Sequence, residues 1–183
     1  YGSKASPYGR VSNWVIGNEI NNQLWNYMGP MSLDTYINEY QRAFRVFYTA
    51  IRSTSQSSRV FFSTDYNWNH DADGSLKYNA KDLLEVFNNK MIPGGSMDWG
   101  LAYHPYSIPL TEPEFWNDRE TGLIADDVSS PVVNMLNLNV LTDYLQQAQF
   151  RTRSGEVRHV ILSEQGFTST SATRGTAEDL QAA

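Results

Sequence analysis

Four short apolar runs alternate with amphipathic segments along this chain, and this alternation restricts its possible folds more than any other feature. The runs expected to form strands are residues 13–17, 59–64, 98–103 and 159–163. Strands that are apolar on both faces pair in parallel and are covered by helices. The pattern therefore predicts an α/β fold with a parallel sheet and right-handed crossovers.

Helices are expected in each of the intervening segments. Ser32 is a plausible N-cap for a helix to about residue 53, whose apolar face is formed by Ile37, Tyr40, Phe44, Phe47 and Ile51. A second helix is expected over residues 80–90. Ser130 followed by Pro131 is typical of an N-cap and first helical position. That third helix would bury Leu136, Val140, Leu141, Tyr144 and Leu145, and a fourth would begin at Thr176 and run to residue 183.

Charge and composition exclude several classes of function. The chain carries a net charge of −6, and an acidic protein repels phosphate backbones, so no nucleic-acid partner is predicted. It has no cysteine, which excludes disulfides and thiolate metal sites. No apolar run approaches the roughly 20 residues that span a bilayer, so no membrane partner is predicted. The chain begins at Tyr1 without a secretion signal, so we expect it to start inside a longer reading frame, and we favour an extracellular or periplasmic location.

The usual cofactor and metal motifs are absent from the sequence, and we predict no cofactor and no metal ion. Residues 65–69 begin like a calcium loop, but His70 stands where the turn needs glycine, and Leu76 where a bidentate Glu belongs. A structural cation on Asp71 and Asp73 stays open as an alternative.

Chemistry-bearing residues follow two of the predicted strands. The strand at residues 13–17 leads into Asn18-Glu19, and the strand at residues 159–163 leads into Glu164. In a parallel sheet both carboxyl groups then face the same mouth. Two opposed carboxyl groups are what cleavage of a glycosidic bond requires, one to donate a proton and one to attack or stabilise the sugar centre.

This arrangement resembles the retaining glycoside hydrolases of the TIM-barrel clan A, the 4/7 superfamily, in which Asn-Glu ends the fourth strand and a nucleophilic Glu ends the seventh. Between Glu19 and Glu164, His104-Pro105-Tyr106 resembles the His-x-Tyr that ends the sixth strand of cellulase-like members. The order of the three motifs is that of the clan, with residues 59–64 as the fifth strand. The chain also resembles barrel proteins known only as glycosidase-like.

The resemblance implies a role for each matching residue. Glu19 would be the acid/base and Glu164 the nucleophile. Asn18 would hydrogen-bond the sugar hydroxyl next to the anomeric carbon, Tyr106 would hold the nucleophile, and His104 would line the same subsite. The alternatives are structural: Glu19 in a loop salt bridge or at a helix terminus, Glu164 accepting from nearby backbone N–H groups, His104 as a satisfied loop histidine, and Tyr106 in the core.

Tryptophans lie in the long segments that follow the strands. Trp25, Trp68 and Trp116 can stack on the C–H face of a sugar ring, or can pack within their own loops. Trp14 and Trp99 fall within strands and are expected in the core.

The resemblance also defines what this chain lacks. Its 183 residues form a single domain that corresponds to strands 4 to 7 of a (β/α)8 barrel, the C-terminal part, without strands 1 to 3 and 8. Two sheet edges should then be open, to be covered by the rest of the barrel or by another copy in a homo-oligomer. The function implied is retaining hydrolysis of O-glycosidic bonds in a poly- or oligosaccharide, with the catalytic pair intact even if the fragment alone is inactive. The alternatives are a carbohydrate-binding pseudo-enzyme and a structural barrel segment.

Overall fold

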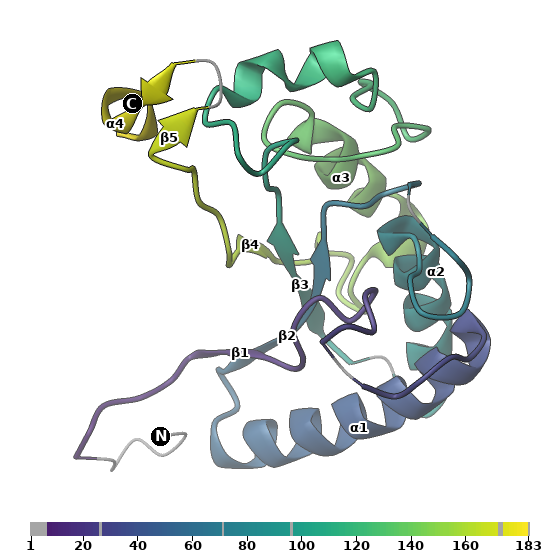
Figure 1. Ribbon diagram of the computed structural model, residues 1–183. Coiled ribbons are helices and arrows are strands. Elements are labelled where there is room, and N and C mark those ends of the chain that lie inside the picture. The colour runs from purple at the N-terminus through teal and green to yellow at the C-terminus, as the bar shows by residue number, and fades with distance from the viewer. Residues whose placement is uncertain (1–6, 26, 71, 96, 172–173, 183) are drawn as a thin grey trace.

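The chain folds into a curled parallel sheet, half of a barrel, with helices packed on its outer face (Figure 1). The computed structural model describes residues 7–182 apart from 26, 71, 96, 172 and 173. The sheet consists of β1 (Asn13–Val15), β2 (Arg59–Asp65), β3 (Trp99–His104) and β4 (Val160–Leu162), which lie side by side in chain order. Every neighbouring pair is parallel, so the α/β prediction is confirmed.

The predicted first and second helices are confirmed. They are α1 (Leu33–Thr54) and α2 (Ala80–Met91). The Ser32 side chain caps α1 by accepting a hydrogen bond from the Thr35 backbone N–H at 3.3 Å. One predicted face residue is wrong: Phe47 is 52% exposed, whereas Tyr36 is buried on the inner face.

The core between the helices and the sheet is largely aromatic. Phe87 of α2 stands at its centre, with ring centroids 4.5 Å from Phe62 of β2 and 5.2 Å from Phe44 of α1. Trp99 of β3 packs on Phe62 at 5.4 Å, so both central strands are fixed to the helices. The Arg158 guanidinium covers the Trp99 ring at 4.3 Å from its centroid. Trp99 is therefore a core residue, as predicted, while Trp14 in the edge strand is only half-buried.

The third helix begins later than the sequence indicates. It is α3 (Leu138–Leu145), and Asn137 is its N-cap residue. The Ser130 hydroxyl instead donates to the Val132 carbonyl. The N–H groups of Val132 and the next residue donate to loop carbonyls, so this stretch is held as extended backbone and Pro131 is not helical. Leu136 precedes the helix, whereas the four later members of the predicted apolar stripe are buried.

The remaining elements are short. They are the 3-10 helices η1 (Phe115–Thr121) and η2 (Ala148–Phe150), the hairpin of β5 (Thr170–Ser171) and β6 (Gly175–Thr176), and α4 (Glu178–Gln181). The predicted helix from Thr176 is wrong at its start, because Thr176 pairs with Thr170 in the hairpin. None of the helices in the described part of the chain is long and apolar enough to span a bilayer.

The strands at the two edges of the sheet are exposed. Among the described residues, β1 pairs only with β2 and β4 only with β3. Val15 and Leu162 show large apolar surface on these edges. The sheet is thus open on both sides, as expected of half a barrel.

Candidate functional site

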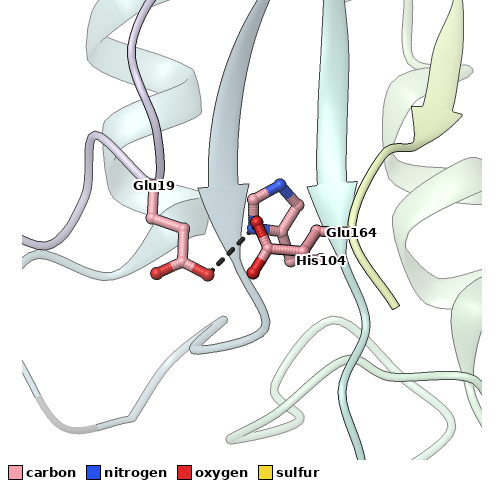
Figure 2. Close-up of side chains that lie close together, drawn as sticks. All are labelled: Glu19, His104 and Glu164. Carbon is pink, nitrogen blue, oxygen red and sulfur yellow. Dashed lines mark hydrogen bonds and ion pairs between the residues drawn. The ribbon is translucent and has the colours of Figure 1, made fainter. Parts of the chain in front are cut away.

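Three chemistry-bearing side chains converge where β1, β3 and β4 end (Figure 2). His104 is the last residue of β3, and its Nδ1 lies 2.9 Å from Glu19 Oε1 and 3.8 Å from Glu164 Oε2. One oxygen of each carboxylate and a ring nitrogen of His104 all lie within 4.8 Å of one another. The structure therefore brings the two glutamates predicted from the sequence to one mouth.

A left-handed turn after β1 delivers Glu19. Gly17 has φ 85° and Glu19 has φ 41°, a conformation that a non-glycine residue adopts only at a cost in free energy. A side chain at Gly17 would also meet Ile20, since an added Cβ would lie 2.8 Å from Ile20 Cγ2. The turn is pinned to β2 because the Glu19 N–H donates to Ser63 Oγ at 3.1 Å. Strain held by such contacts is common at functional sites.

The His104 ring is a buried connector between the strands. It is 2% exposed, and its Nε2 lies 3.2 Å from Ser63 Oγ and 3.1 Å from Ser163 Oγ. A hydroxyl can donate or accept, so Nε2 finds a hydrogen-bond partner in either ring tautomer. His104 thus fixes Glu19 relative to β2 and β4, rather than presenting its ring to solvent.

Tyr106 holds the other glutamate. Its O–H donates to Glu164 Oε1 at 2.8 Å, while the Glu164 side chain is 48% exposed. Partial burial, the hydrogen bond to Glu164 and the negative charges of Glu164 and Glu19 raise the pKa of Tyr106 to about 12. The phenol therefore stays protonated, as a donor, across the physiological pH range.

Trp25 contacts Glu19 directly. Its indole N–H donates to Glu19 Oε2 at 2.7 Å, and more than half of the side chain stays exposed. Both oxygens of Glu19 are consequently engaged, one by Trp25 and one by His104.

An open cavity of about 630 Å³ lies over the glutamates. Its lining combines carboxylates, amides and aromatic rings: Asn18, Glu19, Asn22, Trp25, Asp65, Tyr66, Asn67, Tyr106, Leu110, Glu164, Gly166, Phe167 and Thr168. Rings and fixed polar groups of this kind suit a polar ligand with an apolar face. Among these residues, Asp65 has a raised pKa, chiefly because it is buried. Hydrogen bonds from Asn21 and Asn67 lower this pKa in part, and the negative charge of Glu19 raises it slightly.

Two of the predicted tryptophan platforms do not line this cavity. Trp68 is 1% exposed, and its indole N–H donates to the Val128 carbonyl at 3.1 Å, so it packs inside the loops and offers no face to a sugar. Trp116 is 46% exposed on η1, but it contacts Phe115 outside the cavity lining. Asn18 does line the cavity, and its side chain is exposed there.

Asp73, one of the two residues considered for a structural cation, binds backbone N–H groups of its own loop. Asp73 Oδ1 accepts from the backbone N–H groups of Ser75, Leu76 and Lys77. These bonds lower the pKa of Asp73 to about 2 and use its carboxylate to close a turn. Asp71, the other residue of that hypothesis, lies outside the described residues.

Several site residues were missed by the sequence analysis. Ser63 of β2 and Ser163, directly after β4, contact the histidine, Asp65 ends β2, and Phe167 lines the cavity. For Asp65 a signal existed, because a carboxylate that ends an apolar strand lies at the same sheet edge as Glu19 and Glu164. The serines gave none, since a hydroxyl within or at the end of an apolar strand has no distinctive spacing.

Comparison with known proteins identifies the family but not its chemistry. Residues 1–183 match a family described as Family of unknown function (DUF5722), and the chain belongs to that family. A search of curated proteins and a search of solved structures each found no match.

Proposed function

We propose that this chain carries the catalytic pair of a retaining glycoside hydrolase, within strands 4 to 7 of a (β/α)8 barrel. The observation that carries the proposal is the approach of Glu19 and Glu164, with one oxygen of each within 4.8 Å of the other at the mouth of the sheet. Retaining enzymes hold their two carboxyl groups about 5–5.5 Å apart, and inverting enzymes hold them farther apart to admit a water molecule. The spacing in this site therefore favours retention.

The reaction would proceed in two displacements. Glu19, protonated, gives its proton to the glycosidic oxygen as the bond to the anomeric carbon breaks, and Glu164 forms an ester with that carbon. The freed alcohol leaves. Glu19, now ionised, takes a proton from a water molecule that attacks the same carbon, and Glu164 departs as a carboxylate. The product sugar keeps its original anomeric configuration.

The surrounding residues suit these two roles. Tyr106 donates to Glu164 and so fixes the nucleophile, while the exposed half of the Glu164 side chain leaves it open to substrate. Trp25 lines the same cavity with its ring and can stack on a sugar, and Asn18 supplies an amide for a hydroxyl. Closing the barrel requires four further strands, from a segment outside these residues or from a second copy.

One observation favours a second candidate, a carbohydrate-binding protein without hydrolytic activity. Glu19 accepts hydrogen bonds from both Trp25 and His104, which hold its two oxygens inside the protein. An acid/base needs an oxygen that reaches the leaving group. If these contacts persist with sugar bound, the site binds a glycan without hydrolysing it.

A panel of aryl glycosides tests the proposal on the full-length protein that contains this chain. We expect Glu164→Gln to abolish hydrolysis. We expect Glu19→Gln to slow substrates with poor leaving groups, while dinitrophenyl glycosides, which need no proton donor, are still attacked. Glu120→Gln is the matched control, because Glu120 is exposed on η1 and outside the cavity lining. Equal activity of Glu164→Gln and Glu120→Gln would contradict the proposal, and glycan binding without cleavage would select the second candidate.

A further inference from the structure

Each member of the Glu19, His104 and Glu164 cluster is held by a hydrogen bond on one side and faces the others with its second polar atom. The Trp25 indole N–H donates to Glu19 Oε2, and the Tyr106 O–H donates to Glu164 Oε1. The inward atoms are Glu19 Oε1, His104 Nδ1 and Glu164 Oε2.

The histidine is oriented in the same way. Its Nε2 lies between the hydroxyls of Ser63 and Ser163, each of which can accept an Nε2–H. In that tautomer, which a bound cation would favour over the Nδ1–H form that donates to Glu19, Nδ1 carries a lone pair that points at the two carboxylates. Metal-binding histidines are fixed in this manner by a partner on the ring nitrogen that does not ligate.

We infer that these three atoms bind a divalent transition metal ion of the Zn²⁺ class. Zinc bonds to nitrogen and carboxylate oxygen of about 2.0–2.2 Å place tetrahedral ligands roughly 3.4 Å apart. The separations of 2.9 Å and 3.8 Å from His104 Nδ1 lie on either side of that value. Small rotations of the half-exposed Glu164 side chain complete the set.

The ligand chemistry selects the type of ion. Two carboxylates and an imidazole suit zinc and its neighbours, whereas calcium and magnesium prefer sites made of oxygen alone. Three protein ligands leave a fourth position that faces the cavity, open to water or to a polar ligand. Glu19 and His104 are 85 residues apart in the sequence, so no short motif announces the site.

The ion would occupy the space between the two carboxylates. If the proposed function holds, this is the space that the anomeric carbon needs, so bound zinc blocks hydrolysis; this consequence rests on the proposed function, whereas binding itself does not.

Calorimetric titration of the metal-free full-length protein with ZnCl₂ tests the inference. We expect the wild-type protein to bind one more equivalent of zinc than Glu164→Gln does. If the variant still binds this equivalent, its affinity should be at least tenfold lower than that of the wild type. Tyr106→Phe, which removes only the support of Glu164, should weaken zinc binding about tenfold, as loss of such outer contacts does. His70→Gln and Glu120→Gln are the controls, because both side chains are exposed outside the cluster and should leave the affinity unchanged. MgCl₂ should give no comparable binding.

Visible absorption of bound Co²⁺ provides a second readout that needs no enzyme activity. We expect the intense bands of a four-coordinate ion in the wild type and in His70→Gln, and their loss in Glu164→Gln. Zinc affinity that is equal in Glu164→Gln and Glu120→Gln, or that falls only in His70→Gln, would overturn the inference. Zinc binding by a protein whose metal-free form hydrolyses no glycoside would overturn the proposed function alone, and hydrolysis by a protein that binds no zinc would overturn this inference alone.

Discussion

The substitution Gly100→Ala probes how tightly the central strands of the half barrel pack. Gly100 lies in β3, opposite Phe61 of β2, and four residues before His104. An added Cβ would overlap the Phe61 ring and lie 2.9 Å from the carbonyl oxygen of His159. The carbonyl belongs to the backbone and Phe61 is fully buried, so neither neighbour can move freely.

The expected loss of stability follows from that crowding. Overpacking a core costs about 1–3 kcal/mol, and with two fixed neighbours we expect about 2–3 kcal/mol. In a domain of this size that loss corresponds to a fall in Tm of about 4–12 °C.

Urea unfolding followed by tryptophan fluorescence, together with thermal melting, measures the difference. Gly166→Ala is the control, since an added Cβ there has no neighbour within 4 Å and the backbone is outside the left-handed region. A Gly100→Ala variant within about 0.5 kcal/mol of the wild type, the range of neutral surface changes, would refute the close packing of β2, β3 and β4.

Three further predictions concern the site, the core and a surface turn. Tyr106→Phe removes a hydrogen bond to Glu164. Hydrogen bonds to charged groups contribute about 1.5–3 kcal/mol, and because Glu164 is half exposed we expect the lower value. That energy corresponds to about a tenfold fall in kcat/KM, measured on an aryl glycoside. Phe87→Ala should destabilise the fold by about 3–5 kcal/mol in urea unfolding, whereas Phe47→Ala, at an exposed position, should change stability by less than about 0.5 kcal/mol. The pKa of Asp73 is lowered to about 2 from 3.8, so its stabilising contribution is present above pH 3.8 and is lost as the pH falls toward 2. Asp73→Ala should accordingly lower Tm at pH 6. The difference in Tm between this variant and the wild type should become smaller as the pH is lowered. A difference in Tm that stays constant with pH would contradict the stabilising role of the Asp73 carboxylate.

The sequence predicts the frame of this fold because local signals and burial agree. The apolar strand at residues 59–64 and the Ser32 cap each need only neighbouring residues to be recognised, and both are confirmed. Parallel pairing follows from the alternation with helices, and it brings Glu19 and Glu164 to one edge of the sheet.

The features that the sequence does not predict depend on distant partners. Ser130-Pro131 has the local pattern of a helix start, but the N–H groups that follow it are taken by carbonyls of other loops. Trp68 has the composition of a binding platform, yet its indole N–H is satisfied within the loops by Val128. The contacts of His104 with Ser63 join two strands through side chains, and no spacing along the chain encodes them.

Chemical trapping of the intermediate tests the central claim most directly. The full-length protein is incubated with dinitrophenyl 2-deoxy-2-fluoroglycosides of several sugar configurations, and intact mass and peptide mass spectra are recorded. The fluorine slows both displacements and the dinitrophenyl leaving group speeds only the first, so the glycosyl-enzyme accumulates. We expect one fluoroglycosyl group per chain on the peptide that contains Glu164, and none in Glu164→Gln. Labelling of another residue, or hydrolysis of glycosides with inverted product configuration, would contradict the account.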